Sequence, residues 1–296
     1  MKSQNKLKGA ISALITPFSN GKIDQKSMTR LVEFQLKNGI CGFVVNGTTA
    51  ESPTLNWSEV EELYAIVREV AGHKVPVILG TGSNSTAHTI ETTKKAEQMG
   101  ADAALVVVPY YNKPPQRGLV AHFSEVAAGT SLPVILYNVP GRTITGMTVE
   151  TVVELSKVKN IKAIKEASGD ISFNEKLRSQ LPPDFTMLSG DDPTYIPFLK
   201  AGGAGIISVM SNAIAAPCAR WLALAQEDKW QEAEQEFQKY KELISLMYIE
   251  ANPIPIKWIL YKMGVISTPE MRLPLVELDK NHFDKITEEL KNTGTI

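Results

Sequence analysis

A short apolar run, Ile161-Lys-Ala-Ile-Lys-Glu-Ala-Ser168, holds the side chain with the clearest capacity for chemistry, Lys165. Alternate residues of a β-strand share a face, so Lys165 is expected beside Ile161 and Ala163. Burial there would lower the pKa of the amine. An amine with a pKa of about 7–8, instead of the usual value of about 10.4, can attack a carbonyl as the free base. The run therefore predicts a Schiff-base lysine. The alternative is a lysine that extends into solvent from a strand end.

Hydroxyl groups and one guanidinium follow several other predicted strands. Imine chemistry needs protons moved to and from a carbinolamine, and neutral hydroxyls such as those of Thr48, Tyr111 and Tyr137 can pass them. Arg142 offers a planar fork for a substrate carboxylate. Thr48 and Thr49 could hold a second carboxylate near the lysine. The chemistry so described is Schiff-base formation with a 2-keto acid, followed by an aldol-type addition. Tyr111 could instead be an amphipathic residue at the rim.

Strand-like and helix-like segments alternate along the chain. The predicted strands are 10–15, 42–46, 76–79, 103–108, 133–137, the Lys165 run, 185–188 and 205–209. The predicted helices include one capped by Asp24, one opened by a capping box at Ser58–Glu61, and segments near 85–99, 116–128 and 148–156. Eight such units predict an α/β fold, the (β/α)₈ or TIM barrel, whose chemistry lies at the carboxyl ends of the strands. A doubly wound open sheet is the alternative.

Residues 1–227 are expected to form the barrel, and residues 228–296 a C-terminal helical extension packed on it. An apolar stripe marks the extension, formed by Trp230, Ala233, Phe237, Tyr240, Ile244 and Met247. This stripe could pack on the barrel's own helices or form an oligomer contact.

Three short motifs are interpreted as structural. Gly80-Thr-Gly-Ser-Asn-Ser85 has serine where a dinucleotide fingerprint has its third glycine, which favours a plain strand-to-helix turn. Gly202-Gly-Ala-Gly205 precedes the eighth strand and so lies at the wrong end of a barrel for phosphate binding. Asp191-Asp-Pro193 resembles a helix N-cap followed by proline at the first helical position.

The composition narrows the function classes. The chain has 296 residues, of which 43% are hydrophobic and 21% charged, and its formal net charge of −1 gives no indication of nucleic acid or anionic membrane as a partner. Its two cysteines lie in apolar sequence, which fits a reducing cytoplasm. The four histidines are scattered, so zinc chemistry has little support and no metal is expected.

Six motifs, in consistent order between about Gly9 and Leu278, resemble those of the 4-hydroxy-tetrahydrodipicolinate synthases, also called dihydrodipicolinate synthases. The motifs are Gly47-Thr-Thr-Ala-Glu-Ser52, Pro109-Tyr-Tyr-Asn-Lys-Pro114, Tyr137-Asn-Val-Pro-Gly-Arg-Thr143, Ile164-Lys-Glu-Ala-Ser-Gly169, Leu188-Ser-Gly-Asp-Asp192 and Asn252-Pro-Ile-Pro-Ile-Lys257. The resemblance implies a lyase that condenses pyruvate with L-aspartate 4-semialdehyde on the route to diaminopimelate and lysine. It also implies that no cofactor is needed and that the enzyme is a homotetramer, a dimer of dimers.

The resemblance also implies roles for individual residues. Lys165 matches the lysine that forms the pyruvate Schiff base, and Tyr137 the proton donor and acceptor. Thr48 and Tyr111 complete the relay, with Tyr111 coming from the neighbouring subunit. The matched substrate-binding positions are Thr49, Ile207 and Gly190 together with Arg142, which receives the semialdehyde carboxylate.

Two departures from the family pattern concern Ala50 and the lysine feedback site. The family's usual GTTGE reads Gly47-Thr-Thr-Ala-Glu51 here, with alanine in place of the glycine. The position of Ala50 therefore need not take a positive φ. Lysine-sensitive relatives tend to carry His and Glu at the positions of Val60 and His88, whereas Ser52, Asn84 and Tyr110 of that site remain. A lysine ligand would lose a carboxylate partner at His88, so we expect weak or absent inhibition by lysine.

Three rival functions use related features. Another aldolase of the superfamily, such as N-acetylneuraminate lyase or a keto-deoxy sugar acid aldolase, would share the lysine and tyrosine but typically has GSTGE and lacks Arg142. A catalytically inactive barrel that only senses a metabolite would not need the intact set of Lys165, Tyr137 and Thr48. A phosphosugar isomerase would need a phosphate loop at strands seven and eight.

Overall fold

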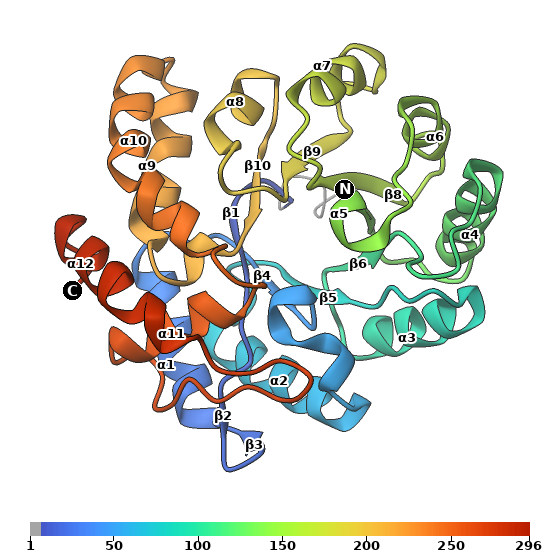
Figure 1. Ribbon diagram of the computed structural model, residues 1–296. Helices are drawn as coiled ribbons and strands as arrows, with labels where there is room; N and C mark the ends of the chain where they lie inside the picture. The colour runs from blue at the N-terminus through green and yellow to red at the C-terminus, as the bar shows by residue number, and fades with distance from the viewer. Residues whose placement is uncertain (1–6) are drawn as a thin grey trace. The chain divides into compact units, whose positions relative to one another are not determined.

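Eight parallel strands form the barrel in a computed structural model that describes residues 7–296 (Figure 1). Their order is β1-β10-β9-β8-β7-β6-β5-β4, closed on itself, with helices between the strands. The strands are β1 (Gly9–Ala13), β4 (Phe43–Val45), β5 (Val77–Gly80), β6 (Ala103–Val107), β7 (Val134–Asn138), β8 (Ile161–Glu166), β9 (Thr186–Ser189) and β10 (Gly205–Ser208). The predicted barrel is therefore confirmed, and the open sheet is wrong.

The chain divides into two compact units. The first contains Pro76–Ile207, and the second contains Gly9–Val75 and Ser208–Ile296. The predicted division into a barrel and an extension at residue 227 stays a prediction, and residues 1–6 of its first part lie outside the described residues.

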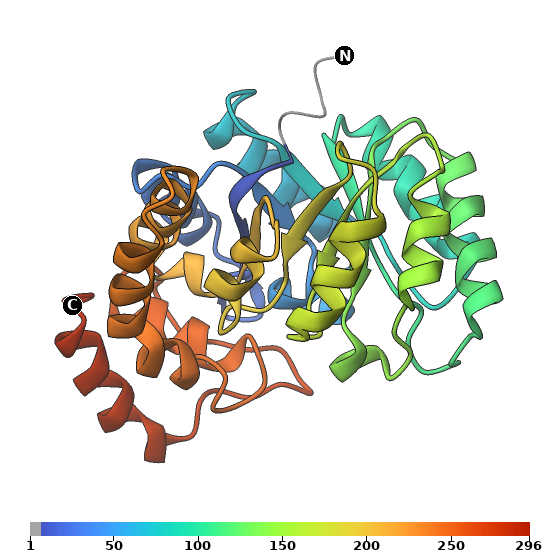
Figure 2. The same ribbon diagram turned by 90° about the horizontal axis from the view of Figure 1, so that it is seen from above.

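In the first unit, strands β5 to β9 pair in parallel with their neighbours, and Tyr137 of β7 is in register with Lys165 of β8. These strands are short, rich in aliphatic residues and buried almost throughout, as is typical of parallel strands covered on both faces. The helices of this unit are α3 (Thr86–Gln98), α4 (Gln116–Ala128), α5 (Pro140–Thr143), α6 (Val149–Leu155), α7 (Ile171–Gln180) and α8 (Tyr195–Lys200). Figure 2 shows α3, α4 and α6 side by side against the strands.

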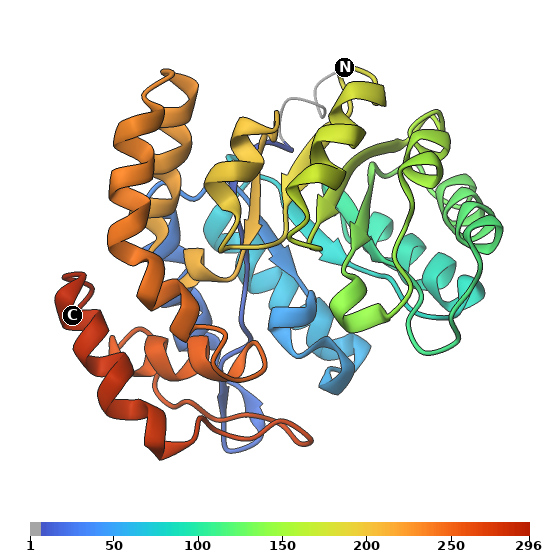
Figure 3. The same cartoon turned by 45° about the horizontal axis from the view of Figure 1, so that its top comes forward.

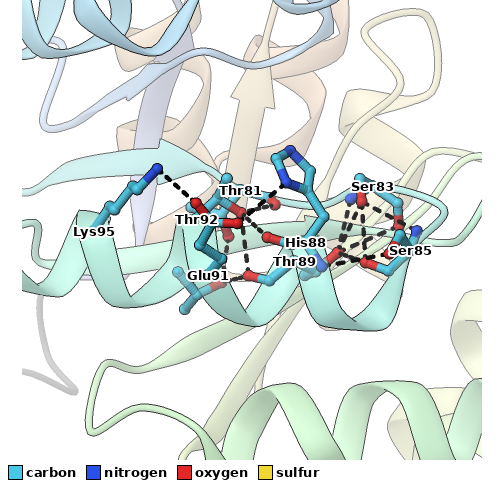
Figure 4. Close-up of polar contacts among 9 residues, drawn as sticks. Thr81, Ser83, Ser85, His88, Thr89, Glu91, Thr92 and Lys95 are labelled. Atoms are coloured by element: carbon cyan, nitrogen blue, oxygen red, sulfur yellow. Dashed lines mark hydrogen bonds and ion pairs between the residues drawn. The ribbon is translucent and has the colours of Figure 1, made fainter.

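A seam of hydroxyl groups joins the end of β5 to α3 (Figure 4). Thr92 Oγ1 donates to the carbonyl oxygen of Thr81 at 2.8 Å, and the hydroxyls of Thr81 and Thr93 lie 2.8 Å apart. Ser85 caps α3, and a Cβ at Gly82 would lie 2.4 Å from the backbone nitrogen of Val107. The Gly80–Ser85 segment is thus a tight strand-to-helix turn, as predicted.

In the second unit, β1 pairs in parallel with β4, and β2 (Phe18–Ser19) pairs antiparallel with β3 (Lys22–Ile23). The helices of this unit are α1 (Gln25–Lys37), α2 (Trp57–Ala71), α9 (Ala215–Gln226), α10 (Trp230–Leu246), α11 (Ile254–Lys262) and α12 (Phe283–Asn292). Figure 3 shows α9 and α10 side by side. The ring of Trp221 on α9 packs edge-to-face on Phe237 and Tyr240, with centroids 4.9 and 5.6 Å away. The apolar stripe of α10 is therefore partly covered by α9 of the same chain.

The predicted capping box at Ser58 and Glu61 is wrong. Helix α2 begins at Trp57, and its capping box consists of Asn56 and Glu59. Asn56 Oδ1 accepts from the Glu59 backbone N–H, and Glu59 Oε2 accepts from the Asn56 N–H, both at 3.0 Å. Ser58 lies inside the helix, and its hydroxyl donates to Asn56 Oδ1. Asparagine caps a helix as well as serine does, so either residue type could have occupied the cap position.

The N-cap predicted at Asp191-Asp-Pro193 is also wrong. Helix α8 starts at Tyr195, with Thr194 at the N-cap position. The Asp191 carboxylate instead accepts hydrogen bonds from the backbone N–H of Thr194 at 3.2 Å and from its hydroxyl at 2.6 Å. The acidic residue holds the turn before the helix and does not begin the helix.

None of the helices found between residues 7 and 296 has both the length and the apolar character that a membrane span requires.

His122 is a buried titratable residue on α4. The residue is 5% exposed, its Nδ1 lies 2.9 Å from Thr86 Oγ1, and its ring packs edge-to-face on Phe123. Burial lowers the pKa of His122 from 6.5 to about 4.

We expect His122→Gln to flatten the acid side of the stability curve. The folded-state pKa of about 4 is below the unfolded value, so the unfolded chain binds more protons as pH falls from 6.5 to 4. The wild type should lose up to about 3 kcal/mol of unfolding free energy across this window through His122. Denaturant unfolding at several pH values would measure it. Equal losses in wild type and variant would contradict this account.

Candidate active site

Lys165 and Tyr137 lie together, as predicted. Lys165 is the penultimate residue of β8, and its side chain is 5% exposed. Tyr137, the penultimate residue of β7, is 6% exposed and is the register partner of Lys165. The Lys165 Nζ lies 4.3 Å from the centroid of the Tyr137 ring. A buried amine and a buried phenol therefore share one face of adjacent strands.

Gly190 gives the lysine its space. A Cβ at this position would lie 2.8 Å from Lys165 Cε, 2.9 Å from Lys165 Cγ and 2.7 Å from Ala167 Cβ. Contacts this short do not occur between real carbon atoms, so the methylene stem of Lys165 can occupy its place only beside a glycine. The structure places Gly190 against the lysine itself, while its predicted substrate contact stays a prediction.

The other predicted residues of the first unit lie in different surroundings. Ile207 on β10 is 1% exposed, within the apolar core. Arg142 is exposed on α5, the single turn that follows β7. Tyr111, in the loop after β6, is 88% exposed and has a φ of 74°, a strained conformation for a bulky residue. Their placement relative to substrate stays a prediction.

Asn138 and Glu166 lie directly behind the Lys165–Tyr137 pair and were not predicted as functional residues. They are register partners that follow Tyr137 and Lys165 in sequence, so they face the opposite side of the sheet. Asn138 Nδ2 donates to Glu166 Oε2 at 2.7 Å, and the backbone N–H of Ser168 donates to Glu166 Oε1 at 2.6 Å. Burial raises the pKa of Glu166, against these hydrogen bonds.

In the second unit, Thr48 and Thr49 form the turn η2 (Thr48–Ala50) after β4. Thr49 is 2% exposed, and its Oγ1 accepts from Asn252 Nδ2 at 3.0 Å. The Ala50 carbonyl accepts from Thr16 Oγ1 at 2.8 Å. The positive φ values of this loop fall on Asn46 (59°) and Glu51 (58°) and not on Ala50. Alanine therefore fits the position, as predicted.

Glu51 anchors this loop through a fully buried ion pair with Lys257 on α11. The Lys257 Nζ lies 2.5 Å from Glu51 Oε1 and also donates to the Glu270 carbonyl at 2.6 Å. Glu51 Oε2 accepts from the backbone N–H of Arg272 at 3.0 Å. Burial lowers the pKa of Lys257 to about 8, although the Glu51 charge acts in the opposite direction. This second buried lysine is committed to acceptors, which separates it in role from Lys165.

Among residues 7–296, no group of three or more His, Cys, Asp or Glu side chains is arranged to hold a metal ion.

A model of the dihydrodipicolinate synthetase family matches residues 6–293. The chain belongs to this family. It is 52% identical over 289 residues to the 4-hydroxy-tetrahydrodipicolinate synthase of Bdellovibrio bacteriovorus, a match that covers 98% of this chain and 99% of the relative. It is 44% identical to the enzyme of the same name from Persephonella marina, covering 98% of this chain and 99% of the relative.

Solved structures of the dihydrodipicolinate synthetase family have the same fold. The dihydrodipicolinate synthase of Thermotoga maritima matches with a TM-score of 0.96 at 39% identity, covering 98% of this chain and 100% of the other. A monomeric dihydrodipicolinate synthase variant matches with a TM-score of 0.97 at 38% identity, covering 99% of each chain.

Gly190→Ala is expected to slow any reaction of the Lys165 amine by about 100-fold, because the added methyl displaces the lysine stem by a few tenths of an ångström or more. Trapping of pyruvate on the protein by borohydride, followed by mass spectrometry, would measure the rate. Gly118→Ala on α4 is a matched control, since a Cβ there meets its nearest neighbours at 3.4 Å. Equal trapping rates in the two variants would contradict the role given to Gly190.

Proposed function

We propose that the chain condenses pyruvate with L-aspartate 4-semialdehyde to give 4-hydroxy-tetrahydrodipicolinate, as a lyase of diaminopimelate and lysine biosynthesis. Family membership and the names of relatives up to 52% identical over nearly the whole chain support this reaction. The observation that carries the mechanism is the buried Lys165 amine beside the Tyr137 ring.

The reaction begins with attack of the Lys165 amine on the keto carbon of pyruvate. A carbon–nitrogen bond forms, the keto oxygen takes up protons, and water leaves to give the imine. Loss of a proton from the pyruvate methyl group then gives an enamine, whose carbon attacks the aldehyde of the second substrate. In this proposal Tyr137 supplies and accepts these protons, a role supported by the burial of its side chain beside the Lys165 amine.

The remaining residues take the roles that the family resemblance gives them. Thr48 and Tyr111 complete the proton relay. Thr49, Ile207 and Gly190 contact the pyruvate part of the intermediate. Arg142 binds the carboxylate of the semialdehyde, a role supported by its fork of donors. The reaction needs no cofactor in this proposal.

Two features favour this reaction over that of N-acetylneuraminate lyase. The loop after β4 reads Thr48-Thr49 in place of the Ser-Thr of GSTGE, and Arg142 follows β7. Semialdehyde-coupled turnover measured beside sialic acid cleavage separates the two aldolases. Adduct formation with pyruvate and no turnover would instead favour a sensing barrel.

A homotetramer in the cytoplasm completes the proposal. Tyr111 is 88% exposed in a strained loop, which suits a side chain that reaches the site of a neighbouring subunit. One structural relative is a monomeric variant, so members of this fold differ in assembly. Measurement of the molecular mass in solution tests whether this chain forms a tetramer.

Borohydride reduction in the presence of pyruvate should place a pyruvyl adduct on Lys165. Lys165→Ala should abolish both the adduct and turnover, whereas Lys162→Ala, a half-buried lysine near the start of the same strand, should keep both. Intact mass and peptide mapping would identify the modified residue. An adduct on Lys162 or Lys257 would overturn the assignment.

Inhibition by lysine should be weak or absent. Val60 is buried on α2. His88 is exposed on α3, with its Nδ1 3.8 Å from Glu91 Oε2, and an imidazole at this position gives a lysine ligand no carboxylate. Introducing one by His88→Glu should strengthen inhibition by about fivefold at most, the worth of an exposed ion pair. Initial rates in a lysine titration would test this. Inhibition of the wild type at micromolar lysine would show the expectation to be wrong.

A further inference from the structure

We infer that Asn138 and Glu166 form a buried brace that positions Tyr137 and Lys165 for the reaction and fixes the loop that carries Arg142. Both are positioning residues that act through their neighbours. The inference rests on the proposed function, because it assigns the brace to the same imine site.

The brace repeats the register of the reactive pair one residue further along. Tyr137 pairs with Lys165, and Asn138 pairs with Glu166. The side chains of Asn138 and Glu166 are 2% and 1% exposed and are joined at 2.7 Å. Since adjacent residues of a strand are linked by a rigid peptide unit, fixing one pair fixes the relative position of the other.

Glu166 also ties the end of β8 to the end of β9. Its Oε1 accepts from the Ser168 N–H, and its backbone oxygen accepts from the Gly190 N–H, both at 2.6 Å. Gly190 packs on the methylene stem of Lys165. Glu166 therefore contacts both the end of its own strand and the glycine that lies against the lysine.

Asn138 extends the brace to the segment between β7 and α6. Its Oδ1 accepts from the backbone N–H of Met147 at 2.9 Å. This segment includes Arg142 and also Ile144, whose φ of 64° is strained for a β-branched residue. Strained residues of this kind persist only where the surrounding structure fixes them. Asn138 therefore holds one end of a strained loop.

The hydrogen bonds of the brace can be completed by two pairs of residues, the present Asn138 with Glu166 or an aspartate at 138 with a glutamine at 166. Glu166 offers two acceptors to two donors, Ser168 N–H and Asn138 Nδ2. A glutamine at 166 would replace one acceptor with a donor. Asn138 could accept from that donor only by rotating its amide, which would break the hydrogen bond from the Met147 N–H to Asn138 Oδ1. An aspartate at 138 beside that glutamine would accept from both and restore every hydrogen bond.

The test is a cycle of three variants, Glu166→Gln, Asn138→Asp and the double variant, with Glu175→Gln on the exposed face of α7 as the matched control. For each, borohydride trapping with pyruvate gives the rate of imine formation, and steady-state assays give kcat and KM for each substrate. Each single variant should lose about 10- to 100-fold in kcat/KM, in both imine formation and use of the aldehyde. The double variant should return to within about threefold of the wild type, because its hydrogen bonds are complete.

Three outcomes would overturn the inference. One is a single variant with wild-type trapping and KM, and another is a double variant no better than the worse single one. If the single variants fail to fold, the double variant decides, since a folded double variant with about 100-fold lower kcat/KM would limit the brace to stability. Absence of a pyruvate adduct in the wild type would instead refute the proposed function, which keeps the two failures distinct.

Discussion

Burying an amine in a protein core requires something to compensate for the water it loses, and this chain does so in two different ways. Lys257 lies against the Glu51 carboxylate, which satisfies its charge and commits it. Lys165 lies over the ring of Tyr137, with its Nζ 4.3 Å from the ring centroid. An aromatic ring does not accept a hydrogen bond as a carboxylate does, so this contact commits the amine less than the Glu51 carboxylate commits Lys257. Two lysines of similar burial therefore have different partners, a carboxylate at Lys257 and an aromatic ring at Lys165.

At the ends of β7 and β8, successive residues face opposite sides of the sheet, so each strand presents one residue to the proposed site and the next residue to the packing behind it. Tyr137 and Lys165 occupy one face, and Asn138 and Glu166 occupy the other, so two consecutive residues on each strand serve different purposes. Polar residues on the hidden face would be unfavourable if they lacked partners. Here they are paired with each other and with the backbone of the following loops.

Local patterns in the sequence predicted the repeated elements well and the helix starts less well. The alternation of segments was enough to predict the barrel, and α4 has the predicted bounds of 116–128. Ser58 and Asp192 are good capping types, yet Asn56 and Thr194 occupy the cap positions, because several neighbouring residues can cap and backbone geometry selects one.

The site was predictable where it depends on residue type and not where it depends on distant contacts. Lys165 and Tyr137 follow from their places at strand ends. The space beside Gly190 and the hydrogen bond between Thr49 and Asn252, 203 residues apart in sequence, have no local signal. Asn138 and Glu166 were visible as polar residues inside the quoted motifs, and the alternation that placed them opposite the reactive pair was the clue to their role.

The supports of the threonine loop come from the last part of the chain. Asn252 binds Thr49, Lys257 binds Glu51, and the Arg272 N–H reaches the same carboxylate. These residues are synthesised more than 200 positions after the loop. The loop therefore lacks their contacts until the last part of the chain has been made. Completion of the loop is therefore linked to completion of the polypeptide, and an interrupted chain that ends before residue 252 would have the threonines but not the contacts that hold them.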